Sequence, residues 1–228
     1  MTSSELQLQV NEVGPVSALL IHPSDAWSLY VLAHGAGAGM RHWFMESIAV
    51  ALGSHGIATL RYHFPYMEAG RKYPDNPRVL EATIQAAFLK AREVEPGLPL
   101  IAGGKSLGGR MTSGAAANGL LAGVKGLVFL GFPLHPPGQP GTTRADHLGQ
   151  VEVPLLFLQG TRDAFARLDL LEQVIGRLPE ATLHLVEDGD HSFQVPKRSG
   201  RSKDEVLEEL CSTIERWARA QVRSKVSA

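Results

Sequence analysis

Short apolar runs alternate with longer stretches of helical periodicity along most of the chain. The apolar runs predict strands at residues 6–10, 16–21, 29–33, 57–62, 98–102, 127–130, 154–158 and 182–186. Helical patterns lie between most of them, at residues 42–54, 77–94, 111–121, 165–177 and 204–222. Continuously apolar strands indicate that helices cover both faces of a sheet, so this order predicts an α/β fold.

The order of the elements also predicts the topology of the sheet. Strand–helix alternation is typical of a doubly wound, mostly parallel sheet flanked by helices. The first two strands have no helix between them, only a turn near Gly14 and Pro15, so we expect them to form an antiparallel edge. Residues 133–150 are too few for a large cap domain, so the site should be open. We expect one domain over residues 1–228.

Composition narrows the class of protein. Hydrophobic residues make up 44% of the chain and charged residues 20%, which suits a well-formed core. The formal net charge is −1, without a long basic block, which argues against nucleic acid as a partner. The single cysteine, Cys211, excludes an internal disulfide and fits a reducing compartment. With neither an 18-residue apolar run nor a signal-peptide pattern, we expect a cytoplasmic protein that does not bind membranes.

The most informative motif is Gly104-Lys105-Ser106-Leu107-Gly108, between a predicted strand and a predicted helix. A serine on such a turn is typical of the nucleophile of an α/β hydrolase. Glycines two before and two after the serine leave room for the neighbouring strand and helix. The alternative is a glycine-rich helix start that packs closely against the sheet, since a chain with 24 glycines can contain this pattern by chance.

Two further side chains follow Ser106 in the order that this fold requires. Asp163 and His191 each come directly after a predicted strand, and such loops gather at the carboxyl edge of a parallel sheet. His191 would take the proton of the serine hydroxyl, and Asp163 would fix the tautomer of the imidazole. Otherwise Asp163 is a helix-capping carboxylate and His191 a solvated loop residue.

Acyl transfer also needs two N–H donors for the oxygen that becomes negative. We predict Leu107, directly after the nucleophile, and Ala36 in the glycine-rich loop after residue 33, with Gly37 as the alternative to Ala36. This chemistry requires no cofactor and no metal ion, and the expected partner is a small-molecule substrate. The oligomeric state stays open.

Three further side chains near these positions are candidates for roles at the site. Lys105, beside the nucleophile, either favours anionic substrates or pairs with a carboxylate on the helix face, and we prefer the second. His135 and His147 lie between the nucleophile and the acid in the sequence, which makes them candidates for the mouth of the pocket.

The glycine-rich loop supports a rival hypothesis. The pattern Gly35-x-Gly37-x-x-Met40 is similar to a dinucleotide-binding fingerprint, and Arg61 at the end of the next strand would suit a 2′-phosphate. However, Met40 replaces the third glycine of that fingerprint, and the rival leaves the Ser–Asp–His order unexplained. We therefore prefer the hydrolase.

Longer motifs occur from the first central strand to the predicted base. They are HGAGAG at 34–39, RYHFPY at 61–66, PD at 74–75, GKSLGGR at 104–110, GFPLHPPG at 131–138, QGTRD at 159–163 and DHSF at 190–193. Together they resemble the KANL3/Tex30-like family of α/β hydrolases. The resemblance implies a small hydrolase fold without a cap, also similar to dienelactone hydrolases, which carry a cysteine where this chain has Ser106. It also implies that the fold can serve as a scaffold, as in some relatives.

These observations predict a serine hydrolase that cleaves a small ester or thioester through an acyl-enzyme, with Ser106, His191 and Asp163 as the triad. The alternative is a binding or scaffold protein with weak turnover or none. An open cavity over a hydrogen-bonded Ser106 would favour the enzyme. A cavity filled by side chains of residues 132–137 would favour the scaffold.

Overall fold

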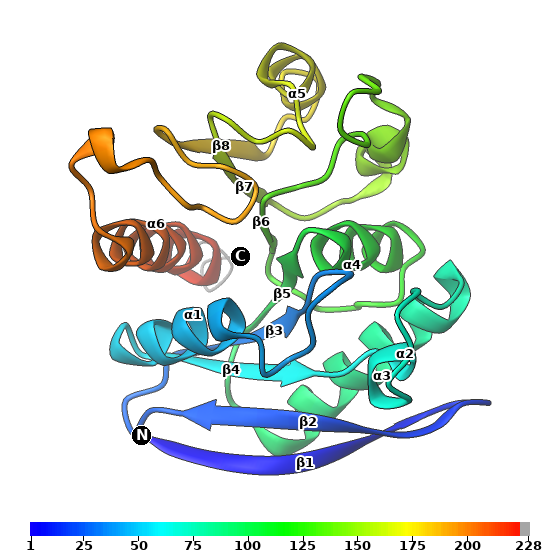
Figure 1. The fold of residues 1–228 in the computed structure, drawn as a ribbon. Coiled ribbons are helices and arrows are strands. Elements are labelled where there is room, and N and C mark those ends of the chain that lie inside the picture. Colours follow the sequence, from blue (N-terminus) through cyan, green and yellow to red (C-terminus); the bar gives the residue numbers. More distant parts are fainter. Residues whose placement is uncertain (224–228) are drawn as a thin grey trace.

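A mixed sheet forms the centre of the molecule (Figure 1). The structure is a computed structural model that describes residues 1–223. Within this range eight strands pair in the order β1-β2-β4-β3-β5-β6-β7-β8. They are β1 (Thr2–Val10), β2 (Gly14–His22), β3 (Ser28–Ala33), β4 (Ile57–Tyr62), β5 (Leu100–Lys105), β6 (Leu127–Leu130), β7 (Leu155–Gly160) and β8 (Ala181–Val186).

The strand directions confirm the predicted topology. β1 pairs antiparallel with β2, and β2 pairs antiparallel with β4, so the two leading strands form the expected antiparallel edge. Every neighbouring pair from β4 across to β8 is parallel. The carboxyl ends of these parallel strands therefore lie along one edge of the sheet, where the loops that follow them meet.

Helices cover both faces of the sheet, as Figure 1 shows. α1 (Trp43–Ser54) and α6 (Lys203–Arg223) pack on one face, and α3 (Pro77–Val94), α4 (Leu107–Ala117) and α5 (Leu168–Ile175) pack on the other. Strand β3 serves both cores, because Tyr30 and Leu32 pack with α1 and α6 whereas Leu29, Val31 and Ala33 pack on the opposite side. Burial on both faces explains why these strands are continuously apolar.

Local chemistry sets the bounds of the longest helix on the α3–α4 face. The side chain of Asn76 caps α3, because its Oδ1 accepts a hydrogen bond from the N–H of Val79 at 3.2 Å. Pro77 occupies the first helical position, where a missing N–H has no consequence. The predicted bounds of this helix are confirmed.

Three short elements were not predicted. They are α2 (Pro65–Glu68) and the 3₁₀ helices η1 (Thr143–Gln150) and η2 (Lys197–Ser199), which lack a long repeat of apolar positions. Helix α5 also begins later than the predicted residue 165, because the N–H of Phe165 bonds to the side chain of Asp163 in a separate turn.

The sheet edge has no separate cap domain within residues 1–223. The segment between β6 and β7 contains only η1, which packs on α4. This agrees with the expectation that residues 133–150 are too few for a large cap. The predicted domain extends to residue 228, and its last five residues lie outside the described part of the chain. None of the described helices is both long and apolar enough to cross a membrane.

Candidate active site

Ser106 lies at the turn between β5 and α4 in a sparsely populated backbone conformation. Its φ is 51° and its ψ is −118°, a combination that persists only where the surrounding structure enforces it. The N–H of Ser106 donates to the carbonyl of Leu130, and its own carbonyl accepts from the N–H of Arg110, both at 3.1 Å. The strand–turn–helix context predicted for this serine is present.

The glycines on either side of Ser106 are required because the end of β3 passes very close. A Cβ atom at Gly104 would lie 2.2 Å from the carbonyl oxygen of Ala33. A Cβ atom at Gly108 would lie 2.5 Å from the carbonyl oxygen of His34. Contacts this short are repulsive, so both positions need glycine for its missing side chain.

The structure brings together the three side chains that the sequence singled out. Asp163 follows β7 and His191 follows β8, so both meet Ser106 at the carboxyl edge of the sheet. The Nε2 atom of His191 lies 2.8 Å from Ser106 Oγ, and its Nδ1 atom lies 2.7 Å from Asp163 Oδ2. Because a carboxylate only accepts, Nδ1 carries the proton, and Nε2 is left to accept the proton of the serine hydroxyl.

Gln159, which sequence reasoning missed, holds the carboxylate in place. Its side chain is buried at the end of β7, where its Nε2 donates to Asp163 Oδ2 at 2.5 Å. Its Oε1 accepts from the N–H of Phe132 at 2.9 Å. The other oxygen of Asp163 accepts from the N–H of Phe165 at 2.7 Å, so both oxygens of this buried carboxylate have donors. The sequence did contain a signal for this role, because Gln159 is the one polar side chain in the otherwise apolar strand β7.

The two predicted oxyanion donors lie at the start of α4 and in the loop after β3. Leu107 is the first residue of α4, where an N–H group has no partner within the helix. At Ala36, the preceding carbonyl of Gly35 lies 2.7 Å from Nδ1 of the buried His34. Since the N–H and C=O of a trans peptide point in opposite directions, the Ala36 N–H points away from the His34 ring.

Two buried side chains fix this loop. The N–H of Phe64 donates to Nε2 of His34 at 3.1 Å, so Nδ1 of His34 carries the proton that binds the Gly35 carbonyl. Burial lowers the pKa of His34 to about 4, which keeps its ring neutral near pH 7. The hydroxyl of Tyr66 donates to the carbonyl of Ala36 at 2.7 Å. The carbonyls of Gly35 and Ala36, on either side of the predicted donor, are therefore each held by a hydrogen bond from a buried side chain.

A cavity of about 410 Å³ opens over Ser106. Its lining residues are Gly35, Ala36, Gly37, Ala38, His42, Trp43, Phe44, Met45, Lys105, Ser106, Phe165, His191, Ser192 and Gln194. Trp43, Phe44 and Phe165 are the aromatic residues of this lining, and the ring of Phe165 lies 4.3 Å from that of His191, centroid to centroid. Residues 132–137 do not line this cavity, and Phe132 and Leu134 are buried in the core instead.

The structure places Lys105 differently from the expected pairing with a carboxylate on the helix face, so that expectation is wrong. Its Nζ donates to the backbone carbonyl of His191 and lies 5.5 Å from the centre of the Phe193 ring. Burial lowers the pKa of Lys105 to about 8, although the charges of Asp163 and Asp190 act in the opposite direction. The side chain therefore turns toward residues 187–194, the loop of the base, which follows β8 and contains His191, rather than along α4.

His135 and His147 do not line this cavity, so their expected place at its mouth is also wrong. His147 Nε2 lies 2.7 Å from the hydroxyl of Ser113 on α4, and His135 Nε2 accepts from the N–H of Arg167 at 2.9 Å. A hydrogen-bonded Ser–His pair thus occurs twice within residues 1–223. The pair at Ser106 differs from the pair at Ser113 because a carboxylate and an open cavity accompany it.

Arg61 does not occupy the position that the dinucleotide hypothesis requires. Its side chain is buried, at 3% exposure, and its Nη1 donates to the carbonyl of Met40 at 2.8 Å. A guanidinium enclosed in this way cannot bind a 2′-phosphate at the open edge of the sheet, and the hydrolase hypothesis is favoured.

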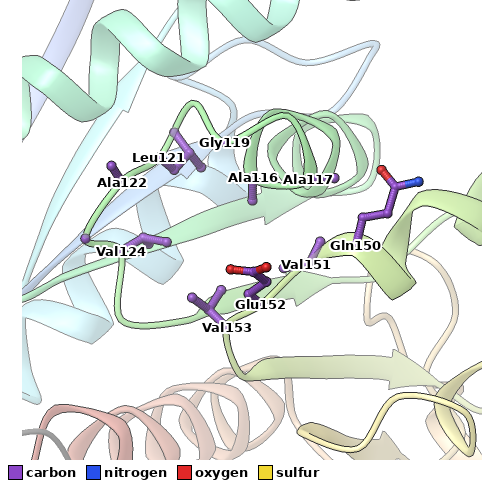
Figure 2. A pocket seen from close by; sticks show the side chains of 11 residues that line it. Ala116, Ala117, Gly119, Leu121, Ala122, Val124, Gln150, Val151, Glu152 and Val153 are labelled. Atoms are coloured by element: carbon purple, nitrogen blue, oxygen red, sulfur yellow. The ribbon is translucent and has the colours of Figure 1, made fainter.

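A second cavity, of about 310 Å³, lies at the amino ends of β6 and β7 (Figure 2). It is lined by Ala116, Ala117, Gly119, Leu121, Ala122, Gly123, Val124, Gln150, Val151, Glu152 and Val153. Small apolar side chains predominate, and Glu152 is the one ionisable residue in this lining. The lining contains no serine, cysteine or histidine, so it offers no nucleophile of the kind found at Ser106.

Comparison with known proteins places these features in context. The family model for the alpha/beta hydrolase domain matches residues 27–219. A dienelactone hydrolase from Anabaena variabilis has a similar structure, with a TM-score of 0.76 and 19% identity over 95% of this chain and 96% of that chain. An α/β serine hydrolase without a lid from Xanthomonas campestris is similar with a TM-score of 0.74 and 21% identity, over 95% of both chains. Est1E from Butyrivibrio proteoclasticus, with ferulic acid bound, is similar with a TM-score of 0.75 and 16% identity, over 95% of this chain and 99% of that chain.

Proposed function

Because the chain belongs to the alpha/beta hydrolase family, we propose that it is a serine hydrolase that cleaves a small ester or thioester. The observation that carries the proposal is the hydrogen-bonded series Ser106–His191–Asp163 beside an open cavity. A serine hydroxyl is a weak nucleophile until a neighbouring base accepts its proton, and the base needs an acid to hold its tautomer. Each of these groups has a matching side chain at hydrogen-bond distance.

In the proposed reaction, His191 Nε2 accepts the proton of Ser106 as Oγ attacks the carbonyl carbon of the substrate. The N–H groups of Leu107 and Ala36 stabilise the negative charge that develops on the carbonyl oxygen. His191 then donates its proton to the leaving alcohol or thiol, and an acyl-enzyme remains. Water, activated by His191, releases the acid by the same route, while Asp163 stabilises the imidazolium in both halves.

The cavity supports a small, largely apolar substrate. Its volume of about 410 Å³ is within the range of pockets that hold small molecules, and Trp43, Phe44 and Phe165 offer rings for an apolar group. Residues 132–137 do not fill it, which favours turnover over the scaffold alternative. Membership of the KANL3/Tex30-like group, a single domain over residues 1–228 and a cytoplasmic location remain predictions from the sequence.

A fluorophosphonate probe, which reacts with activated serines, tests the proposal. The unmodified protein should be labelled, and the Ser106→Ala variant should not. Ser113→Ala is the matched control, because Ser113 also bonds to a histidine but lies buried away from the cavity. This control should be labelled at the rate of the unmodified protein. Equal labelling of all three proteins, or of none, would exclude Ser106 as the nucleophile. A series of esters graded by acyl length would then define the substrate.

A further inference from the structure

Lys105 joins the loop of the base to the turn of the nucleophile. It is the residue directly before Ser106, and its Nζ donates to the backbone carbonyl of His191. The ammonium group also lies 5.5 Å from the centre of the Phe193 ring, in a cation–π arrangement. The side chain of the residue next to the nucleophile therefore makes two contacts with the loop of the base, one with the His191 carbonyl and one with the Phe193 ring.

Gly131 leaves the space that the ammonium group occupies. A Cβ atom at Gly131 would lie 3.0 Å from Lys105 Nζ, 3.3 Å from the His191 carbonyl oxygen and 3.4 Å from His191 Nδ1. These three atoms thus surround one point at the end of β6. The ammonium group of Lys105 and the His191 carbonyl therefore meet directly beside Gly131.

The loop of the base has a backbone that benefits from such an anchor. Asp188 and Phe193, on either side of His191, have φ values of 58° and 59°, in the left-handed region that non-glycine residues seldom adopt. Hydrogen bonds within the loop hold Asp190 to Phe193 and to Gln194. The carbonyl of His191 is instead satisfied from outside the loop, by Lys105.

We propose that Lys105 is a positioning residue of this site, which fixes the backbone of His191 relative to Ser106. The proposal rests on the proposed serine hydrolase. The charged groups that face Lys105 are Asp163, after β7, and Asp190, in the base's loop. Burial leaves the pKa of Lys105 at about 8, so the group is mostly charged at pH 7 and loses its charge above pH 8.

Replacement by methionine keeps the length and apolar stem of the side chain but removes the charge and the donor. Lys105→Met should lower kcat about 10- to 100-fold while KM changes less than about threefold, because a displaced base affects the reaction rather than binding.

Restoring the ammonium group separates positioning from general destabilisation. Treating Lys105→Cys with bromoethylamine rebuilds a lysine-like side chain, and it should recover most of the lost kcat. The chain's own Cys211 is buried, and burial raises its pKa to about 12, so it should not react. The comparison of Lys105→Cys before and after treatment also tests the proposal if Lys105→Met does not fold, because both measurements use the same variant.

An NMR measurement at one fixed pH decides the proposal without any turnover. The imidazole signal of His191, assigned by its absence in His191→Gln, should change its chemical shift in Lys105→Met, because the ring moves relative to Ser106 and Phe165. The bromoethylamine-treated Lys105→Cys variant should return the signal toward its position in the unmodified protein. A wild-type protein that neither reacts with the probe nor hydrolyses esters would overturn the proposed function, while this spectrum would still test Lys105. An unchanged signal together with unchanged kcat, or a change in KM alone, would overturn the role of Lys105.

Discussion

The cavity at the carboxyl ends of the parallel strands and the cavity at the amino ends of β6 and β7 are of similar size, about 410 and 310 Å³. Their chemistry is different. The first brings together a serine, a histidine, a lysine and aromatic rings from the carboxyl ends of four different strands and the segments that follow them. The second is lined mainly by alanine, glycine and valine, with one carboxylate. Loops after parallel strands converge at one edge, so they can combine residues that are distant in sequence.

Backbone geometry separates the two cavities as well. At the carboxyl end, Ser106 has a positive φ, and Gly104 touches the backbone of β3. At the amino end, Gly119 and Gly123 also have positive φ values, of 73° and 87°, but a Cβ atom at either would meet nothing within 4 Å. The glycines at the amino end therefore serve ordinary turns, whereas those at the carboxyl end are enforced by packing around the serine.

The largest difference should appear when one carboxylate is neutralised at each end. Asp163→Asn should lower kcat about 10⁴-fold, because an amide in place of the carboxylate favours the wrong tautomer of His191. Glu152→Gln, the matched change in the other cavity, should leave kcat within about twofold of the unmodified protein. Steady-state hydrolysis of a small ester measures both. A comparable loss in Glu152→Gln would mean that the amino-end cavity takes part in the reaction.

The next largest contrast concerns the glycines. In Gly104→Ala the new methyl group would meet the Ala33 carbonyl at 2.2 Å, at a φ of +154°, so we expect a loss of about 3 kcal/mol or more in the free energy of unfolding. Gly123→Ala has open space and only an unfavourable φ, so we expect a loss of about 1 kcal/mol. Urea unfolding compares the two, and equal losses would show that β3 moves away to accommodate the new methyl group.

The sequence predicted the parts of the site that depend on chain order and on strong local motifs. Ser106 stands in a five-residue pattern, while Asp163 and His191 stand directly after apolar strands, so the topology of the sheet was enough to bring them to one edge. The distances among them, 2.7 and 2.8 Å, confirm that arrangement, and their catalytic roles remain proposals.

The features of the site that the sequence analysis missed or predicted wrongly depend on which partner a side chain contacts. Lys105 was expected to follow the helix face, but its hydrogen bond goes to a loop 86 residues later in the chain. Gln159 bonds both to Asp163 and to the backbone of Phe132. His147 turns to Ser113 rather than to the cavity. Such contacts join separate loops, and no periodic pattern along the sequence encodes them.

The last contrast, in the pH dependence of stability, concerns one histidine from each end. His34, after β3, has a pKa lowered to about 4 by burial, so the unfolded chain binds more protons than the folded chain between pH 4 and pH 6.5. Its contribution is therefore present at neutral pH and is lost as the pH falls, by on the order of 3 kcal/mol.

His55 lies at the end of α1, just before the amino end of β4, and should act with the opposite sign. Burial tends to lower its pKa, but hydrogen bonds with Glu215 and Glu208 prevail and raise it. Its contribution is therefore present at acidic pH and is lost as the pH rises through the raised value. Urea midpoints measured from pH 4 to pH 8 should rise less steeply on the acid side in His34→Gln, and fall less steeply toward neutral pH in His55→Gln. If the urea midpoint of His34→Gln changes with acid pH as steeply as that of the unmodified protein, His34 is not held neutral in the folded state. The loop that carries Ala36, the predicted oxyanion donor, would then lack that support.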